Sequence, residues 1–79
     1  MKFTGTLCRA ARTALNLSNG QLAELAGVGV NTVSRFEQGS DVRLSSADAI
    51  REAIEAQGVV FTSAGQVAAV DSMGLQDRP

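Results

Sequence analysis

Apolar residues recur at helical spacing in two stretches near the start of the chain. The first stretch runs from about Thr6 to Leu15, and Thr4 or Thr6 is suited to cap its start. The second begins after Ser18, which stands three residues before Gln21 in the pattern of a capping box, and stops at Gly27. The pattern therefore predicts two helices, of which the second is only about two turns long.

Two further helical stretches follow. The third covers roughly residues 30–38 and is closed by Gly39, as the second is closed by its own glycine. The fourth is predicted to begin after Ser45, with Asp48 as the capping-box partner, and to end at Gly58. Short turns between such helices favour an all-α core.

The pattern changes after the fourth helix. Residues 59–62 and 66–70 are typical of two strands, with a turn at 63–65 between them. The last nine residues, 71–79, show no periodicity and are expected to form a flexible tail. The expected fold is mainly α, with four or five helices and a C-terminal β-hairpin over 59–70, in one domain covering residues 1–70.

The composition argues against several functions. The chain has 79 residues and no histidine, tyrosine or tryptophan, so the commonest general base and metal ligand are missing. We therefore expect no catalysis, no metal and no cofactor. Its one cysteine, Cys8, is expected to be a small apolar core residue in a reduced, cytoplasmic protein. No run of about 18 apolar residues is present, so we expect no membrane partner.

Charge is distributed unevenly along the chain. The net charge is −1, but residues 1–45 carry a balance of +2 and residues 46–79 a balance of −3. The first half is therefore the better candidate for contact with phosphate. This surplus of positive charge is small, so it predicts modest affinity for a nucleic acid.

The most informative block lies between Asn19 and Phe36. Ala23 is small enough for another helix to cross over it, and Gly27 supplies the backbone angle for a sharp change of direction. Val28 and Val33 are suited to fill the inside of the turn. Two short helices joined in this way leave one face of the later helix exposed. That face is expected to carry Asn31, Ser34, Arg35 and Gln38.

The residue types on this face suit the edges of DNA bases. Asparagine can pair with adenine through two hydrogen bonds, arginine can do so with guanine, and a valine methyl can meet the methyl of thymine. A face that is merely solvated remains an alternative for Asn31 and Arg35, and Val30 fits a core position as well as a base contact. Arg43 could equally be an ordinary loop charge.

This block resembles the Cro and phage-repressor class of helix-turn-helix regulators. The resemblance rests on Leu22-Ala23 with Gly27-Val28, and on the run from Thr32 to Gly39. It implies a helical core over about residues 4–57, whose third helix enters the major groove. It also implies contacts to DNA bases from Val30, Asn31, Thr32 and Arg35. Contacts to the DNA backbone are implied for Asn19, Gln21, Ser34, Gln38, Ser40 and Arg43.

Two more features follow from the resemblance and the hairpin. The class often pairs the glutamate before the closing glycine with an arginine of the first helix, which here implies a structural pair of Glu37 and Arg12. A two-stranded hairpin is poorly stable alone. Its apolar residues are expected either to cap the core or to form a dimer interface, the latter through Val60, Val67, Ala68 and Val70.

The expected function is therefore that of a transcription regulator, most often a repressor. A homodimer would bind double-stranded DNA at a palindromic operator, with its two third helices about 34 Å apart. The protein would act in the cytoplasm of a bacterial cell or a phage-infected host, and would be nucleoid-associated when bound. The alternative is an antitoxin-like or adaptor module that mainly binds a protein partner, since the second half is acidic and the hairpin apolar.

Overall fold

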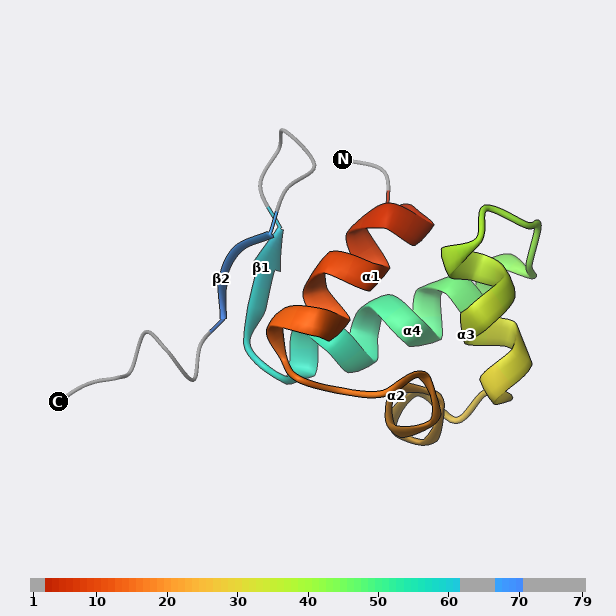
Figure 1. The fold of residues 1–79 in the computed structure, drawn as a ribbon, viewed down its shortest axis with the longest axis horizontal. Helices are drawn as coiled ribbons and strands as arrows, with labels where there is room; N and C mark the ends of the chain where they lie inside the picture. The colour runs from red at the N-terminus through yellow and green to blue at the C-terminus, as the bar shows by residue number, and fades with distance from the viewer. Residues whose placement is uncertain (1–2, 62–66, 71–79) are drawn as a thin grey trace, which may run out of the picture.

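The computed structural model describes residues 3–61 and 67–70, and it is mainly helical within them (Figure 1). The turn at 63–65 and the tail over 71–79 lie outside the described residues. The predicted fold class is confirmed. The elements are, in order, α1 (Gly5–Ala14), α2 (Asn19–Ala26), α3 (Val30–Glu37), α4 (Leu44–Ala56), β1 (Val59–Phe61) and β2 (Val67–Val70).

The first two helices begin at the predicted caps. The hydroxyl of Thr4 accepts from the Leu7 N–H at 3.2 Å. At the start of α2 the hydroxyl of Ser18 accepts from the Gln21 N–H at 3.0 Å, while the Gln21 side chain accepts from the Ser18 N–H at 2.8 Å. This reciprocal capping box satisfies two backbone donors that the helix itself leaves unpaired.

The turn between α2 and α3 has the predicted glycine elbow. Gly27 adopts φ 72°, in the left-handed region that side chains with a β-carbon rarely enter. The Val28 N–H then donates to the Ala23 carbonyl at 3.0 Å, which closes the end of α2. Because α3 begins only three residues after the elbow, the two helices diverge and α3 does not continue the direction of α2 (Figure 1).

The predicted start of α4 is wrong. The helix begins at Leu44 with Arg43 in the cap position, and no side chain caps it. Ser45 therefore lies inside the first turn and makes no capping box with Asp48. A side-chain cap contributes only about 1 kcal/mol. The packing of the preceding loop, where Val42 is half-buried, can therefore decide where the helix starts.

The core lies where the four helices meet. Its largest fully buried side chains are Leu22, Ile50, Ile54, Val33 and Cys8. α4 packs against α2 and also contacts α1 and α3. Of the two positions left open for Val30, the core position is excluded, because 48% of this residue is exposed. No helix in residues 3–61 or 67–70 combines the length and apolar character needed to cross a membrane.

The two strands form an antiparallel hairpin that extends the core at the end opposite α3 (Figure 1). Val59 is buried, whereas Val60 is 56% exposed. β1 packs against α4 and β2 lies beside α1. In the strand register Val59 pairs with Val70, Val60 with Ala69 and Phe61 with Val67, with a bulge between the last two pairs.

The chain's three phenylalanines link the hairpin to the end of α3. The Phe3 ring stacks on Phe36 with centroids 5.4 Å apart and meets Phe61 edge-on at 5.5 Å. Phe3 therefore fills the space between the closing turn of α3 and the first strand. This aromatic cluster fixes the distant end of α3 to the core.

Candidate nucleic-acid interface

One side of α3 is polar and exposed, and we call it the reading face. Val30, Asn31, Arg35 and Gln38 are exposed there, while Ser34 is half-buried at one edge and Thr32 at the other. The buried Val33 and the half-buried Phe36 occupy the opposite side. The structure thus brings the predicted base readers together, with Val30 on the surface. The exposed part of this face carries one cation, Arg35, and no carboxylate.

Behind the reading face, α3 is tied to α1 by a buried ion pair. The Arg12 guanidinium donates to both carboxylate oxygens of Glu37, at 2.8 and 3.0 Å, and to the Leu17 carbonyl at 2.9 Å. Only 2% of the Glu37 side chain and 18% of the Arg12 side chain are exposed. The pair implied by the resemblance is therefore present, and together with the Leu17 carbonyl it occupies the Arg12 guanidinium.

Cys8 completes this cluster in a way that the sequence did not indicate. Its thiol donates to Glu37 Oε2 at 3.3 Å, and the exposed Arg9 adds a longer contact at 3.4 Å. Burial, followed by the hydrogen bond and charge of Glu37, raises the pKa of the Cys8 thiol far above its ordinary value. Cys8 is therefore held as a neutral thiol and serves the packing of α1 against α3.

The acid–base state of the pair follows from its contacts. Burial alone would raise the pKa of Glu37, but hydrogen bonds from Arg12, Cys8 and Arg9, with the charge of Arg12, lower it overall. The hydrogen bond to Glu37 raises the pKa of Arg12. Both groups are therefore charged at neutral pH.

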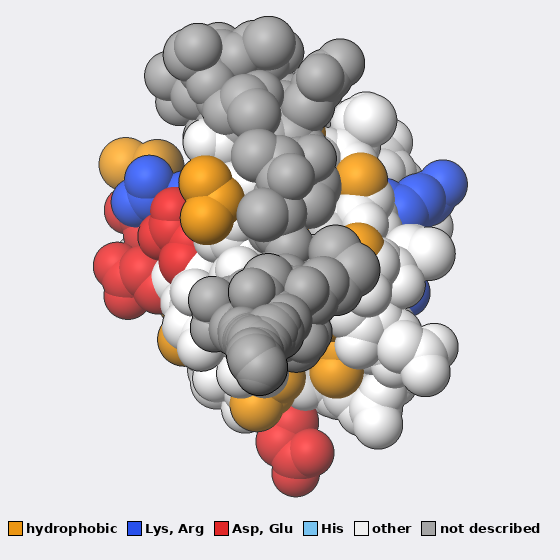
Figure 2. Space-filling model, turned by 90° about the vertical axis from the view of Figure 1, so that its left-hand side faces the viewer, with side chains coloured by type: hydrophobic (Ala, Val, Ile, Leu, Met, Phe, Trp, Pro, Cys, Tyr) orange, Lys and Arg blue, Asp and Glu red, His pale blue; other side chains and the backbone are white. Residues whose placement is uncertain are grey.

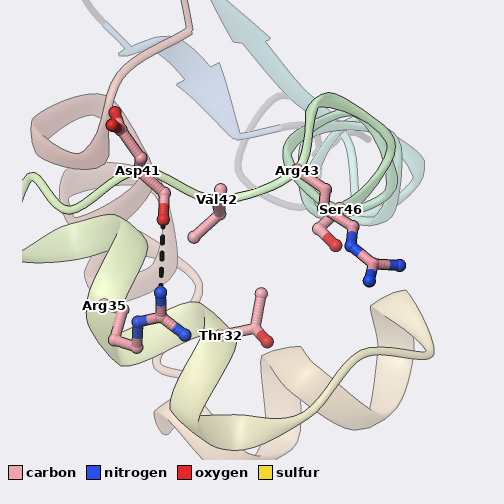
Figure 3. A pocket seen from close by; sticks show the side chains of 6 residues that line it. All are labelled: Thr32, Arg35, Asp41, Val42, Arg43 and Ser46. Atoms are coloured by element: carbon pink, nitrogen blue, oxygen red, sulfur yellow. Dashed lines mark hydrogen bonds between the residues drawn. The ribbon is translucent and has the colours of Figure 1, made fainter.

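A hollow of about 630 Å³ adjoins the reading face. It is lined by Thr32, Arg35, Asp41, Val42, Arg43 and Ser46. Figure 3 shows the guanidinium of Arg35 and the side chain of Thr32 directed toward the hollow from α3, with Arg43 on the far side at the start of α4. Arg35 Nη2 also donates to the Asp41 carbonyl at 3.4 Å. This contact links Arg35 on the reading face to the loop that follows α3.

The N-terminus of α4 opens beside the same hollow. The first backbone amides that bond within this helix are those of Ser46 and Ala47, which both donate to the Arg43 carbonyl at 3.0 Å. α3 likewise has no side-chain cap, since its cap residue is Gly29. Uncapped helix N-termini favour anions, because their free N–H groups and the helix dipole present positive charge.

The residues predicted to contact the DNA backbone come from α2, from α3 and from the loop that follows α3. Ser40 and Arg43 are exposed in the loop after α3, and Gln38 is exposed at the end of α3. Gln21 is also exposed, but its side-chain oxygen is occupied by the capping box. Asn19 and Ser34 are bonded to each other, with Asn19 Nδ2 donating to Ser34 Oγ at 3.1 Å.

Gly5, in the first turn of α1, was not singled out from the sequence. A β-carbon there would collide with the Phe36 carbonyl oxygen and lie 2.9 Å from Glu37 Cα, so the backbones of α1 and α3 come too close for any side chain. The sequence carries no local sign of this, because the partner residues are far away along the chain.

Comparisons with known proteins agree with this geometry. A family model described as helix-turn-helix matches residues 9–57, which include α2, the elbow at Gly27 and α3. A protein of Archaeoglobus fulgidus named "Putative HTH-type transcriptional regulatory protein" is 41% identical over 54 residues. The matched part is 68% of this chain and 18% of that protein, so the chain spans less than a fifth of the relative's length. The chain belongs to the helix-turn-helix family of the Cro and phage-repressor type.

Proposed function

We propose that this chain is the DNA-binding part of a transcription regulator and that it inserts α3 into the major groove of double-stranded DNA. The observation that carries the proposal is the reading face, a polar surface free of exposed carboxylates on a helix that the elbow at Gly27 turns outward. A helix presented in this way fits the width of the major groove. The regulator named among the relatives supports the same function.

Sequence reading is assigned to the exposed part of this face and to Thr32 at its edge. Asn31 would pair with adenine and Arg35 with guanine, while Val30 and Thr32 would contact thymine methyl groups. Val30 is exposed at the very start of α3, which suits a helix that enters the groove with its N-terminal end.

The hollow beside α3 is assigned to the DNA backbone. A phosphate near the start of α4 would meet the helix N-terminus and the guanidinium of Arg43. Ser40 and Gln38 are exposed just after α3, and Gln21 would approach the DNA backbone from α2. Because few of these groups are charged, we expect a shallow dependence of affinity on salt.

Selection of bound fragments from a random pool of duplex DNA tests the proposal. We expect a preferred sequence with a repeated half-site, whose spacing gives the distance between two copies of α3. Recovery of random fragments without enrichment would contradict sequence-specific binding.

Replacing Arg35 with alanine should remove discrimination at one guanine of the selected site. Loss of a bidentate contact lowers the preference by about 1–3 kcal/mol, or roughly 5- to 150-fold. Competition between the selected duplex and a variant changed at that base measures the effect. The free energy of unfolding should stay unchanged, because Arg35 is exposed and makes one long contact to a carbonyl. If discrimination at that guanine is unchanged, Arg35 is assigned to the DNA backbone and not to a base.

We further propose that the chain acts as a homodimer, most often as a repressor at a palindromic operator in the cytoplasm, where it would associate with the nucleoid. Val60 supports a dimer interface on the hairpin, since it is a large apolar residue exposed on β1. The other proposed interface residues are Val67, Ala68 and Val70, of which Val70 pairs in register with the buried Val59. A symmetric interface between two hairpins would be centred on the exposed side of β1 that carries Val60.

Changing Val60 to glutamate is expected to produce monomers, because two carboxylates would meet across the symmetry axis. Binding to a duplex with two half-sites should weaken about 100-fold, while binding to a single half-site changes little. Sedimentation of the free protein measures the oligomeric state. Val60→Thr, which keeps the branched shape, is the matched control. A Val60→Glu protein that still sediments as a dimer would exclude the hairpin as the interface.

A protein partner is the second candidate function. The outward side of α4 carries Asp48, Glu52 and Glu55, and Figure 2 shows acidic side chains gathered on one flank of the hairpin side of the molecule. This flank would suit an adaptor or antitoxin-like role, with DNA binding secondary. A partner recovered at equal ratio that is released by Glu52→Lys would support it.

A further inference from the structure

The hydrogen bond between Asn19 and Ser34 joins the two helices of the helix-turn-helix. Asn19 is the first residue of α2, and Ser34 lies in the middle of α3 at the edge of the reading face. Both side chains are half-buried between the helices. Among the side-chain hydrogen bonds within residues 3–61, it is the one that connects α2 with α3.

The end of this hydrogen bond that lies on α2 is held in place by the capping box. Asn19 lies inside the capping box, where Ser18 and Gln21 bond reciprocally at 3.0 and 2.8 Å. The buried core on which the two helices pack is apolar and includes Ala23 and Val33. Apolar burial has no preferred direction, whereas a hydrogen bond does. The bond is therefore suited to fix the rotation of α3 about its own axis.

Asn19 is incompletely satisfied in this arrangement. Its Oδ1 is buried and accepts no hydrogen bond from the described residues. A buried acceptor without a donor costs free energy, so stability alone would favour an apolar residue here. Its amide is also engaged with Ser34 and not turned outward to a phosphate.

We propose that Asn19 is a positioning residue that sets the orientation of the reading face through Ser34, and that neither side chain serves mainly as a contact to the DNA backbone. The inference rests on the proposed function. Rotation of α3 would move Asn31 and Arg35 together relative to the base edges, since both lie on the same side of the helix as Ser34. Loss of the bond should therefore weaken recognition of sequence more than attachment to DNA.

A double-mutant cycle tests this proposal, with Asn19→Ala, Ser34→Ala and both changes together. Binding is measured to the duplex selected from the random pool and to a random-sequence duplex of equal length. We expect each single change to weaken binding to the selected duplex by about 3- to 10-fold, the double change to add nothing further, and binding to the random duplex to stay constant. Thermal unfolding of each variant confirms that the domain is folded.

Arg43→Ala is the matched control for a backbone contact. It should weaken binding to both duplexes by the same factor, because a phosphate contact carries no sequence information. If Asn19→Ala behaves like Arg43→Ala, or if the two single effects multiply in the double variant, the positioning role is excluded. Failure of the unmodified protein to prefer any duplex would instead overturn the proposed function itself.

Discussion

Replacing Glu37 with glutamine is expected to lower the free energy of unfolding by about 3 kcal/mol. The carboxylate is 2% exposed and receives both hydrogen bonds of a bidentate Arg12, so its removal leaves a cation with little access to water. Breaking a buried pair by removing one partner costs roughly 3–5 kcal/mol, and the partial exposure of Arg12 places this case at the low end. Denaturation by urea measures the loss.

Arg9→Ala is the control for this prediction. Arg9 also contacts Glu37, but its side chain is 61% exposed and the distance is 3.4 Å, so a loss below about 1 kcal/mol is expected. Lowering the pH gives a second measurement. The folded-state pKa of Glu37 lies below its ordinary value of 4.5, so its contribution is complete above that pH and is lost as the pH falls through the lowered pKa. Equal stability of the two variants would contradict the assigned pair.

The parts of this fold that could be predicted depend on short-range signals. The capping box at Ser18 and the elbow at Gly27 involve residues within four positions of one another, and their chemistry has few alternatives. The reading face follows from helical periodicity once the elbow is known. The prediction failed at the start of α4, where the helix begins at Leu44 without the cap that Ser45 could have supplied, because such a cap contributes only about 1 kcal/mol.

The parts that could not be predicted depend on contacts between distant residues. The thiol of Cys8 bonds to Glu37, and Asn19 bonds to Ser34, but neither pairing leaves a trace in the local pattern of its own helix. Val30 was ambiguous for a related reason. A valine at the start of a helix fits the core or the surface equally well, and only the angle between α2 and α3 determines which it is. The sequence therefore identified most residues of the candidate interface, but not the distant residues that they contact.

Gly5 is the clearest case of a hidden constraint, and its replacement gives the other large effect. Gly5→Ala is expected to destabilise the domain by about 3 kcal/mol, because the new β-carbon would meet the backbone of Phe36 and Glu37, which cannot rotate aside. Gly20→Ala is the matched control. There the nearest atom is the Ser18 hydroxyl at 3.8 Å, so the better helix propensity of alanine should stabilise α2 by up to about 1 kcal/mol.

In thermal unfolding, Gly5→Ala should therefore lower the melting temperature, whereas Gly20→Ala should raise it. Since the backbone that Gly5 approaches is the end of α3, any Gly5→Ala protein that still folds must shift α3 away from α1. Such a protein should bind the selected duplex more weakly, whereas Gly20→Ala should bind it normally. If the two variants are equally stable, α1 and α3 do not approach closely at Gly5. The close approach of α1 would then not be what holds α3 in position.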